Sequence, residues 1–536
     1  MIKDPYQEGI ARGWKVVDAA KLVGDREDDA DVVIVGSGAG GGISAEILAK
    51  SGLRVIVVEE GPLRSTQDFH MREADAYPAL YQESAARKTA DKGINILQGR
   101  CVGGSTTVNW TSSFRTPPAT LEFWQRQFGL ADYTQEALLP WFETVERRLS
   151  ISAWYVPPNA NNEILRLGAS KLGIETQVIR RNVNGCWNLG YCGTGCPTNA
   201  KQSMLVTTLP AALDLGATIY SGLRAERLVF GGDKVTALEC VAMDAAGIHP
   251  QARRVRLRAK HFVLAGGAIG SPALLLRSGV PDPSGQLGRR TFLHPTVVSS
   301  ALMDSVVAGH AGAPQSLYSD HFLDKLPIDG PLGYKLEAPP LHPVLFATTL
   351  QGFGEGHAAL MQQFNHAQVL LALLRDGFNE SSRGGQVRLR DDGTPLLDYP
   401  LDEVVWDGAR RALLSMAEIQ FAAGAKKVYA VHEECSGWDN WAAAKEGIAR
   451  LPMRALSLRV VSAHVMGGCA MGTDAGRAVV DPRGRHHQLG NVTVADGSLF
   501  PTSIGANPQQ SVYGIVARNI SVLAESLTGK AAAPLA

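Results

Sequence analysis

Two short apolar runs near the start of the chain flank a helical pattern. Residues 31–35 are rich in β-branched side chains, as expected of a strand that is buried on both faces. A glycine-rich turn follows at 36–42, and residues 43–50 then carry apolar side chains at helical spacing. A second apolar run at 54–59 ends with Glu59. This order predicts a strand–turn–helix–strand unit, which is typical of an α/β fold.

The glycines of the first turn have the spacing of a dinucleotide-binding fingerprint. Gly36, Gly38 and Gly41 would allow a tight turn, a close approach of the backbone to a pyrophosphate, and close packing of the helix on the strand. Glu59 stands where a carboxylate accepts a hydrogen bond from a ribose hydroxyl. The unit therefore predicts dinucleotide binding. FAD and NAD share the fingerprint, and its place near the N-terminus favours FAD.

Two further turns rich in small residues occur at 99–110 and 264–279. Consecutive glycines and hydroxyl side chains in the first leave backbone N–H groups exposed, which suits contact with a phosphate or a planar ring. An ordinary tight turn accounts for the same pattern. The second turn is predicted to join a buried strand to a short helix that begins with Ser271 and Pro272.

The C-terminal part of the chain places polar side chains next to predicted strands and a helix. Residues 456–464 are predicted to form a strand that ends at His464, and residues 492–498 a strand that ends in an acid and a small turn. A long helix should follow, with Asn507 as N-cap and Pro508 in its first position. Taken alone, His464 is explained as a satisfied core histidine and Asn507 as a helix cap.

The composition excludes several functions without naming one. The 536 residues correspond to about three to four structural units. The 52 basic side chains balance 52 acidic ones, whereas a nucleic-acid-binding protein would show a basic excess and a disordered chain a high net charge. The longest charge-free stretch, between Asp496 and Arg518, contains prolines and amides, so no transmembrane segment is expected.

Seven cysteines are too few for a disulfide framework in a chain of this length, which favours a reducing compartment. The first residues lack a basic stretch followed by an apolar one, so no signal peptide is expected. We therefore expect a cytoplasmic protein, and the sequence leaves open a peripheral association with a membrane.

The three glycine turns and the C-terminal segments, taken in order, resemble the glucose–methanol–choline (GMC) flavoprotein oxidoreductases. The resemblance extends from about residue 31 to near residue 525 around a variable middle, and it is specific because four separated segments agree in type and order. Within that family the chain is most similar to the long-chain (fatty) alcohol oxidase/dehydrogenase branch. That placement rests on the stretches 13–18, 108–110 and 195–203.

The resemblance implies an α/β fold with two domains. One is a discontinuous, Rossmann-like FAD-binding domain, and the other is an α+β substrate-binding cap domain built on an antiparallel sheet. The FAD-binding domain would comprise residues 1–115, 205–300 and 455–536, and the cap would comprise 116–204 and 301–454, including the Cys-rich loop 186–196.

The resemblance also assigns chemistry to two polar side chains. His464 matches the active-site histidine of the family, and Asn507 matches the second member of its His–Asn pair. Alcohol oxidation requires removal of the hydroxyl proton as hydride leaves the carbon. An imidazole can act as this general base near neutral pH, and an amide N–H can hold the developing alkoxide. The hydride acceptor would be flavin N5.

The residues expected to contact FAD lie in the glycine turns, at the end of the second strand and in the C-terminal block. They are Gly36, Gly38, Gly41, Glu59, Gly103, Gly104, Ser105, Asn109, Asp496, Gly497 and Pro508. The helix N-terminus at Pro508 could stabilise negative charge on a reduced flavin ring. Some relatives attach FAD through a histidine where this chain has Val108, so a non-covalent FAD is expected.

Three of the seven cysteines, Cys186, Cys192 and Cys196, lie within 11 residues, and a proline follows the last. They resemble part of an iron–sulfur ligand run, and the loop is similar to the cluster-bearing loop of FAD-dependent glucose dehydrogenases in the same superfamily. The spacing differs from four-cysteine runs and a fourth local cysteine is missing, so free or zinc-binding thiols are the alternative. A cluster would favour a dehydrogenase over an oxygen-reducing oxidase.

The resemblance implies FAD-dependent oxidation of a hydrophobic, long-chain primary alcohol to the aldehyde. The apolar stretch 369–374 mildly favours such a substrate, although runs of this kind are more often core than pocket wall. The alternatives are a sugar or polyol dehydrogenase that uses an iron–sulfur cluster, a flavin-dependent lyase, and a non-catalytic flavin electron carrier. Oxygen, a quinone or a redox partner would accept the electrons, a small partner subunit is conceivable, and no nucleic acid is expected.

Overall fold

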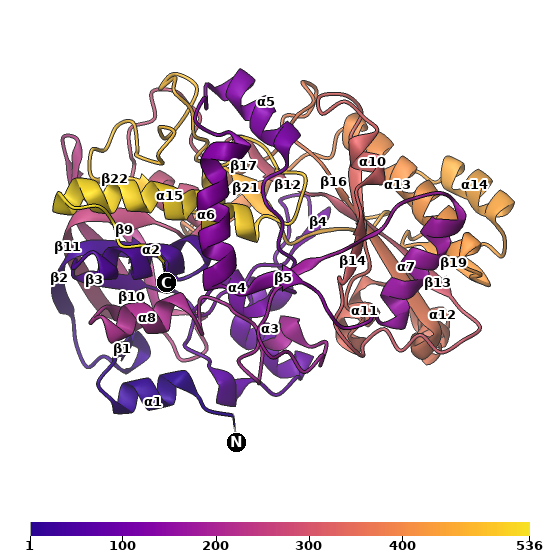
Figure 1. Ribbon diagram of the computed structural model, residues 1–536, viewed down its shortest axis with the longest axis horizontal. Helices are drawn as coiled ribbons and strands as arrows, with labels where there is room; N and C mark the ends of the chain where they lie inside the picture. The colour runs from indigo at the N-terminus through magenta and orange to yellow at the C-terminus, as the bar shows by residue number, and fades with distance from the viewer. Residues whose placement is uncertain (1, 536) are drawn as a thin grey trace.

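The computed structural model describes residues 2–535. Residues 1 and 536, the outermost positions of the predicted FAD-binding domain, lie outside this range. Two large β-sheets lie side by side along the longest axis of the molecule, each with its own helices (Figure 1). The fold is a mixed α/β fold, as the sequence predicts.

The first sheet has eight strands within residues 2–535, in the order β1-β8-β3-β2-β11-β10-β9, with β22 paired to β11. Its strands β1, β8, β3, β2, β11 and β22 run parallel, while β9, β10 and β11 form an antiparallel meander. The bounds are β1 Lys15–Asp18, β2 Arg26–Val35, β3 Val55–Val58, β8 Thr218–Ser221, β9 Leu223–Gly231, β10 Lys234–Met243, β11 Pro250–Leu264 and β22 Val492–Val494.

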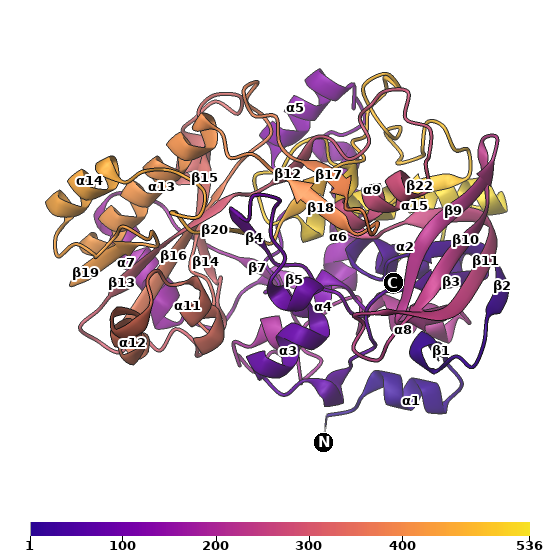
Figure 2. The same cartoon turned by 180° about the vertical axis from the view of Figure 1, so that it is seen from behind.

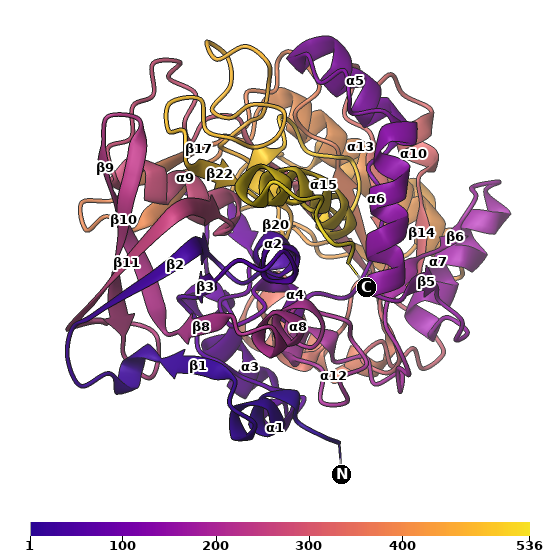
Figure 3. The same ribbon diagram turned by 60° about the vertical axis from the view of Figure 1, so that its left-hand side comes forward.

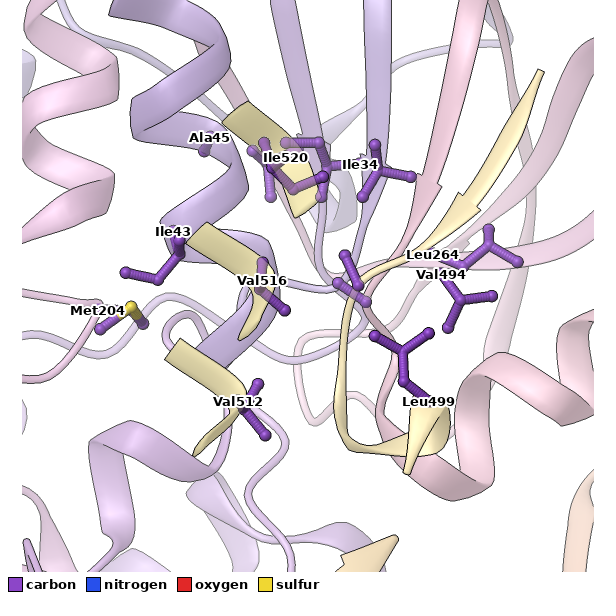
Figure 4. Packing of buried hydrophobic residues seen from close by; sticks show 14 of the residues in the cluster. Ile34, Ile43, Ala45, Met204, Leu264, Val494, Leu499, Val512, Val516 and Ile520 are labelled. Carbon is purple, nitrogen blue, oxygen red and sulfur yellow. The ribbon is translucent and has the colours of Figure 1, made fainter. Parts of the chain in front are cut away.

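The predicted strand–turn–helix–strand unit is present as β2, α2 (Ala39–Lys50) and β3. The helix begins four residues earlier than the apolar pattern indicated, because Gly40, Gly41 and Gly42 belong to its first turns. Helices α8 (Thr208–Asp214) and α15 (Gln509–Thr528) pack on α2. Figure 4 shows the resulting core, where side chains of β2, α2 and α15 meet; labelled members include Ile34, Ile43, Val516 and Ile520.

The second sheet follows the order β4-β20-β13-β16-β15-β14-β6, with β19 paired to β13. Its pairs are antiparallel except for β20 with β4, which are parallel, so the predicted antiparallel sheet is mixed at one edge. The bounds are β4 Ile94–Ile96, β6 Gln177–Val178, β13 Thr296–Leu302, β14 Leu317–Ser319, β15 Tyr334–Glu337, β16 Ala367–Leu374, β19 Lys427–Ala430 and β20 Val460–Ser462.

Helices cover both faces of the second sheet (Figure 2). On one face, α13 (Glu403–Ala422) packs on β13 and β16 and against α7 (Ala160–Lys171) and α14 (Trp441–Arg450). On the other, α11 (Pro343–Thr349) contributes to a separate apolar cluster, and α12 (Gly354–Gln362) follows it. The second sheet is therefore enclosed by helices on both sides.

The apolar run in β16 serves both faces of this sheet. Leu370, Ala372 and Leu374 belong to the core shared with α13. Val369, Leu371 and Leu373 alternate with them and line a large cavity. Successive side chains of a strand point to opposite faces. One face of β16 therefore belongs to the core and the other forms a wall of the cavity, whereas an apolar run of this kind is more often core alone.

Some strands and helices depart from the predicted domain ranges. β4, β20 and most of β13 lie in ranges assigned to the FAD-binding domain, yet they pair in the second sheet. Helices α5 (Pro118–Phe128) and α6 (Gln135–Arg148) fall in the range predicted for the cap, but residues of both belong to the core of the first sheet. Figure 3 shows α6 beside α15. The chain thus crosses between the two sheets more often than predicted, and the division into domains stays a proposal.

The remaining elements connect the two sheets or cap them. They are the helices α1 Pro5–Ala11, α3 Glu73–Leu80, α4 Ser105–Val108, α9 Gly267–Arg277 and α10 His321–Asp324, and the strands β5 Ile151–Ala153, β7 Arg180–Asn182, β12 Thr291–Leu293, β17 Gln386–Leu389, β18 Pro395–Asp398 and β21 Val465–Gly467. Helix α9 begins before the predicted start at Ser271, so Pro272 lies inside it. In the described range, each helix is too short or too polar to cross a membrane.

Candidate active site

A cavity of about 1050 Å³ lies between the two sheets. One end is bordered by the three glycine turns and the ends of β2 and β3, and the other by β13, β16 and α11. Among the predicted site residues, those that line it are Gly36, Gly38, Glu59, Gly104, Ser105, Asn109, His464, Asp496, Gly497, Asn507 and Pro508. Gly41 and Gly103 lie behind its wall.

The first glycine turn forms an open cradle at the N-terminus of α2. A Cβ on Gly38 would lie 3.8 Å from the nearest atom, the Cα of Gly104, so space remains above it. A Cβ on Gly41 would overlap the carbonyl oxygen of Gly36, so the first turn of α2 packs too closely on the end of β2 to leave room for a side chain there. A helix N-terminus with exposed backbone favours a phosphate, and these residues fit a dinucleotide.

Glu59 is buried, and its carboxylate holds the first turn. It accepts hydrogen bonds from the backbone N–H (3.1 Å) and hydroxyl (2.5 Å) of Ser37 and from the N–H of Gly61 (2.9 Å). Burial raises the pKa of this carboxyl. A ribose hydroxyl would share the carboxylate with Ser37. Glu60 also lines the cavity. It is not among the predicted site residues, although it is adjacent to Glu59.

The second glycine turn contacts the first through its backbone. Gly104 has φ +54°, and a Cβ there would lie 2.8 Å from the Cα of Gly38. The N–H of Gly103 donates to the Ser37 hydroxyl at 2.9 Å. Asn109 donates from Nδ2 to Gln509 at 2.7 Å and so ties this turn to the start of α15. These links place one edge of the cavity between two glycine turns.

Asp496 joins the third glycine turn to the C-terminal block. Its carboxylate accepts from the N–H groups of Gly267 and Ser498, both at 2.8 Å, and from the hydroxyl of Ser271 at 2.6 Å. Burial raises the pKa of this carboxyl. Asp496 therefore shapes the cavity wall beside the N-terminus of α9, and Gly497 continues the same wall.

His464 follows β20 and lines the cavity beside a second histidine. Its Nδ1 lies 2.9 Å from Nδ1 of His294, which is buried just after β12. The backbone N–H of Gly505 donates to Nε2 of His294 at 3.1 Å. Burial lowers the pKa of His464 to about 4 and that of His294 well below its ordinary value. Both imidazoles are therefore neutral at pH 7.

The backbone N–H of Gly505 fixes where the protons of these imidazoles lie. A neutral imidazole has one N–H and one acceptor nitrogen. Because His294 accepts at Nε2, its proton is on Nδ1 and is donated to Nδ1 of His464. His464 then carries its own proton on Nε2. His294 is not predicted from the sequence, where its place just before Pro295 is the only local signal.

Asn507 lines the same cavity and hydrogen-bonds away from the helix that follows it. Its Nδ2 donates to Oε2 of Glu337 at 3.4 Å, and its Oδ1 is buried with no partner in the described part of the chain. The predicted N-cap role is wrong: α15 begins at Gln509 after Pro508, and the Asn507 side chain is turned to Glu337 instead. Pro508 lines the cavity beside it.

The cysteine loop does not assemble the predicted ligand set. Cys192 accepts from the guanidinium of Arg181 at 3.7 Å, Cys196 contacts the hydroxyl of Thr198 at 3.4 Å, and Cys186 accepts a backbone hydrogen bond. Across residues 2–535, no group of three or more His, Cys, Asp or Glu side chains is arranged to hold a metal ion. The iron–sulfur interpretation is therefore not supported, since each thiol is engaged locally.

Comparisons with known proteins agree with this geometry. GMC oxidoreductase family models match residues 77–296 and 380–515, and an FAD binding domain model matches 31–74. A GMC-type oxidoreductase of Mycobacterium tuberculosis is 31% identical over 91% of this chain and 74% of its own length. A long-chain-alcohol oxidase of Arabidopsis thaliana is 28% identical over 94% of this chain and 68% of its own length.

A solved structure of pyridoxine 4-oxidase from Mesorbium loti has the same fold. It superposes with a TM-score of 0.67 and 21% sequence identity, covering 91% of this chain and 98% of the other. At this identity the likeness establishes the arrangement of the two sheets.

Proposed function

Because the chain belongs to the GMC oxidoreductase family, we propose that it oxidises a hydrophobic, long-chain primary alcohol to the aldehyde with a non-covalently bound FAD. It is an FAD-dependent oxidoreductase that acts on CH–OH groups. The proposal concerns the substrate, the roles of His464 and Asn507, and the mode of FAD attachment.

The apolar end of the cavity carries the substrate proposal. Its walls come from β13, β16 and the segment around α11, and the apolar residues there are Val298, Leu341, Leu345, Phe346, Leu350, Val369, Leu371, Leu373, Val431 and Val461. The other residues that β13 and α11 contribute to the cavity are Thr296, Ser300 and Thr349, so none of the lining residues from β13, β16 or α11 is charged. Burying an alkyl chain against such a surface contributes about 0.8 kcal/mol per methylene group. The Arabidopsis relative is named for long-chain alcohols.

The glycine turns and α2 suit the other end of the cavity to FAD. Gly38 leaves room at a helix N-terminus for the pyrophosphate, and Glu59 and Glu60 lie at the end of β3 where a ribose would be held. Val108 offers no nucleophile for a covalent bond to the flavin. When bound, FAD supplies the hydride acceptor at N5.

His464 and Asn507 would act on the hydroxyl group of the substrate, at the point where the FAD end of the cavity meets its apolar end. The O–H proton passes to Nε2 of His464, and an N–H of Asn507 holds the oxygen while hydride leaves the carbon. His464 can accept at Nε2 when its own proton lies on Nδ1 and is donated to His294. That form gives up the hydrogen bond from Gly505 to His294 and leaves a buried N–H unpaired, at a cost of about 1–3 kcal/mol.

Anaerobic reduction of the bound flavin tests the proposal. Dodecanol should bleach the flavin absorbance of the purified holoenzyme, and glucose or glycerol should not. His464→Ala should slow bleaching at least about a hundredfold, the usual contribution of a general base, while the flavin spectrum stays that of bound FAD. Equal bleaching by glucose would favour the polyol alternative, and no bleaching by any alcohol would favour a lyase or an electron carrier.

The electron acceptor is proposed to be oxygen, because the similar long-chain-alcohol proteins of Arabidopsis are named oxidases. Re-oxidation of the reduced enzyme by air, with hydrogen peroxide as product, supports this assignment. Re-oxidation only by a quinone would make the enzyme a dehydrogenase. The expected cytoplasmic location stays a prediction.

A further inference from the structure

Glu337 is a buried carboxyl group that the reaction above does not use. It is the last residue of β15, with 0% of its surface exposed. The cavity wall in front of it is formed by Gln315 and Asn507, which line the cavity while Glu337 does not. A charged group in such a place normally has a structural or functional reason, because burying it without partners is costly.

Two amide side chains converge on one oxygen of this carboxyl group. Oε2 of Glu337 accepts from Nε2 of Gln315 and, at 3.4 Å, from Nδ2 of Asn507. Oε1 of Glu337 and Oδ1 of Asn507 are both buried without a hydrogen-bond partner in residues 2–535. A carboxylate only accepts hydrogen bonds, whereas an amide offers either a donor or an acceptor end. The ionised Glu337 therefore binds the NH2 group, and not the oxygen, of the Gln315 and Asn507 side chains.

Within residues 2–535, Glu337 has no ion pair of its own. Lys335, two residues earlier on β15, forms its ion pair with Asp320, and its ammonium lies 4.2 Å from the ring centre of Phe114 and 4.1 Å from that of Tyr318. Burial raises the pKa of Glu337 to about 7; Lys335 and the two amides act in the opposite direction, and Asp320 adds to the rise. Gln315 and Asn507 are uncharged.

We propose that Glu337 is a positioning residue that orients the Asn507 amide for the substrate oxygen. Its carboxylate holds one N–H of Asn507 Nδ2, which leaves the second N–H of the same nitrogen for the cavity. Gln315 is held in the same way and becomes a further contact for the alcohol hydroxyl group. A protonated Glu337 can instead donate a hydrogen bond to Oδ1 of Asn507. This stabilises the Asn507 amide with Oδ1 and Nδ2 exchanged, so that the acceptor Oδ1, and not an N–H, faces the alkoxide. This role rests on the proposed alcohol oxidation.

Glu337→Gln is the variant that tests this role in the FAD-loaded enzyme. Glutamine has the same shape but can donate as well as accept, so it no longer selects one end of the Asn507 amide. We expect flavin reduction by dodecanol to slow about tenfold or more, since misplacing a donor to an oxyanion is costly. The apparent Kd for dodecanol from the same kinetics should change little, because the alkyl wall is intact.

A double-mutant comparison distinguishes positioning from general support of the fold. In an Asn507→Ala background, Glu337→Gln should have no further effect on flavin reduction, because the amide it orients is gone. The matched control is Glu46→Gln on α2, which removes another buried carboxylate, paired with Arg148 at 3.0 Å, away from the cavity. It should lower Tm without changing the rate.

The pH profile supplies a readout that needs no Glu337 variant. His464 is neutral above about pH 4, so a rise of the wild-type rate through about pH 7 would report ionisation of Glu337. Glu337→Gln and Asn507→Ala should each flatten this rise. The positioning role is overturned if Glu337→Gln has the rate and pH profile of the wild type. It is also overturned if Glu337→Gln slows flavin reduction as much in the Asn507→Ala background as in the wild type. Failure of dodecanol to reduce the wild-type flavin would instead refute the proposed function.

Discussion

The Nδ1 atoms of His294 and His464 lie 2.9 Å apart, with the two rings nearly perpendicular. One imidazole must donate to the other, and the N–H of Gly505 at Nε2 makes His294 the donor. Gly505 lies two residues before Asn507 and has φ +75°. The turn that carries Asn507 therefore also sets the proton position of His464, which couples the two proposed catalytic groups.

Replacing His294 tests this coupling. His294→Leu removes the partner of His464 Nδ1 and leaves the buried N–H of Gly505 unpaired, which costs about 1–3 kcal/mol. We expect Tm to fall and flavin reduction by dodecanol to slow at least about tenfold, while FAD stays bound. His294→Asn keeps a side chain that can hydrogen-bond to His464 and should recover most of the rate. Equal rates for Leu and Asn, measured by stopped-flow absorbance, would contradict the coupling.

Two neighbouring glycines of the first turn should respond differently to alanine. A Cβ on Gly40 would overlap the carbonyl oxygen of Ala495, so Gly40→Ala should yield little folded protein. A Cβ on Gly38 meets no protein atom closer than 3.8 Å but occupies the cradle at the start of α2. Gly38→Ala should therefore fold with a near-native Tm as apoprotein and bind FAD at least about tenfold more weakly.

Thermal melting of the apoproteins and fluorescence titration with FAD check both variants. Weak FAD binding by a well-folded Gly38→Ala protein supports the pyrophosphate site. Unchanged affinity would mean that the pyrophosphate lies elsewhere along the cavity.

Local sequence patterns were sufficient for the unit β2–α2–β3, which follows from a β-branched run and a glycine spacing. For His464 and Asn507 local patterns indicate only a core histidine and a helix cap. The expectation that they share a site comes from the resemblance to the GMC family, and both side chains line one cavity. The partners of these two side chains were not predictable from either source. His294 and His464 are 170 residues apart in the chain, as are Glu337 and Asn507, so only the tertiary fold brings each pair together.

The errors have a similar physical origin. Asn507 has the residue type and position of an N-cap, but a buried carboxylate on β15 competes for its amide. The three cysteines are close in sequence, but the loop directs them to Arg181, Thr198 and a backbone N–H. Spacing alone does not determine where short polar side chains find their partners.

The thiols of the cysteine loop should be dispensable for electron transfer. Since no metal-binding group forms among the described residues, Cys192→Ser should reduce an artificial dye with dodecanol at the wild-type rate. Iron and acid-labile sulfide in anaerobically purified protein provide the check. The iron–sulfur interpretation would be restored if the wild-type protein contained stoichiometric iron and if Cys192→Ser lost both this iron and the reduction of the dye.

The two faces of β16 allow a test of chain-length preference. Val369 lines the cavity, whereas Leu370 faces the core beneath α13. Val369→Phe should fill part of the apolar end and exclude about two methylene groups of a long alcohol. At about 0.8 kcal/mol each, the loss is about 1.6 kcal/mol, or roughly fifteenfold in kcat/KM for hexadecanol, with butanol unaffected. Leu370→Ala should instead lower stability by about 2–5 kcal/mol and leave the preference unchanged. If Val369→Phe lowers kcat/KM equally for butanol and hexadecanol, the alkyl chain does not lie along β16.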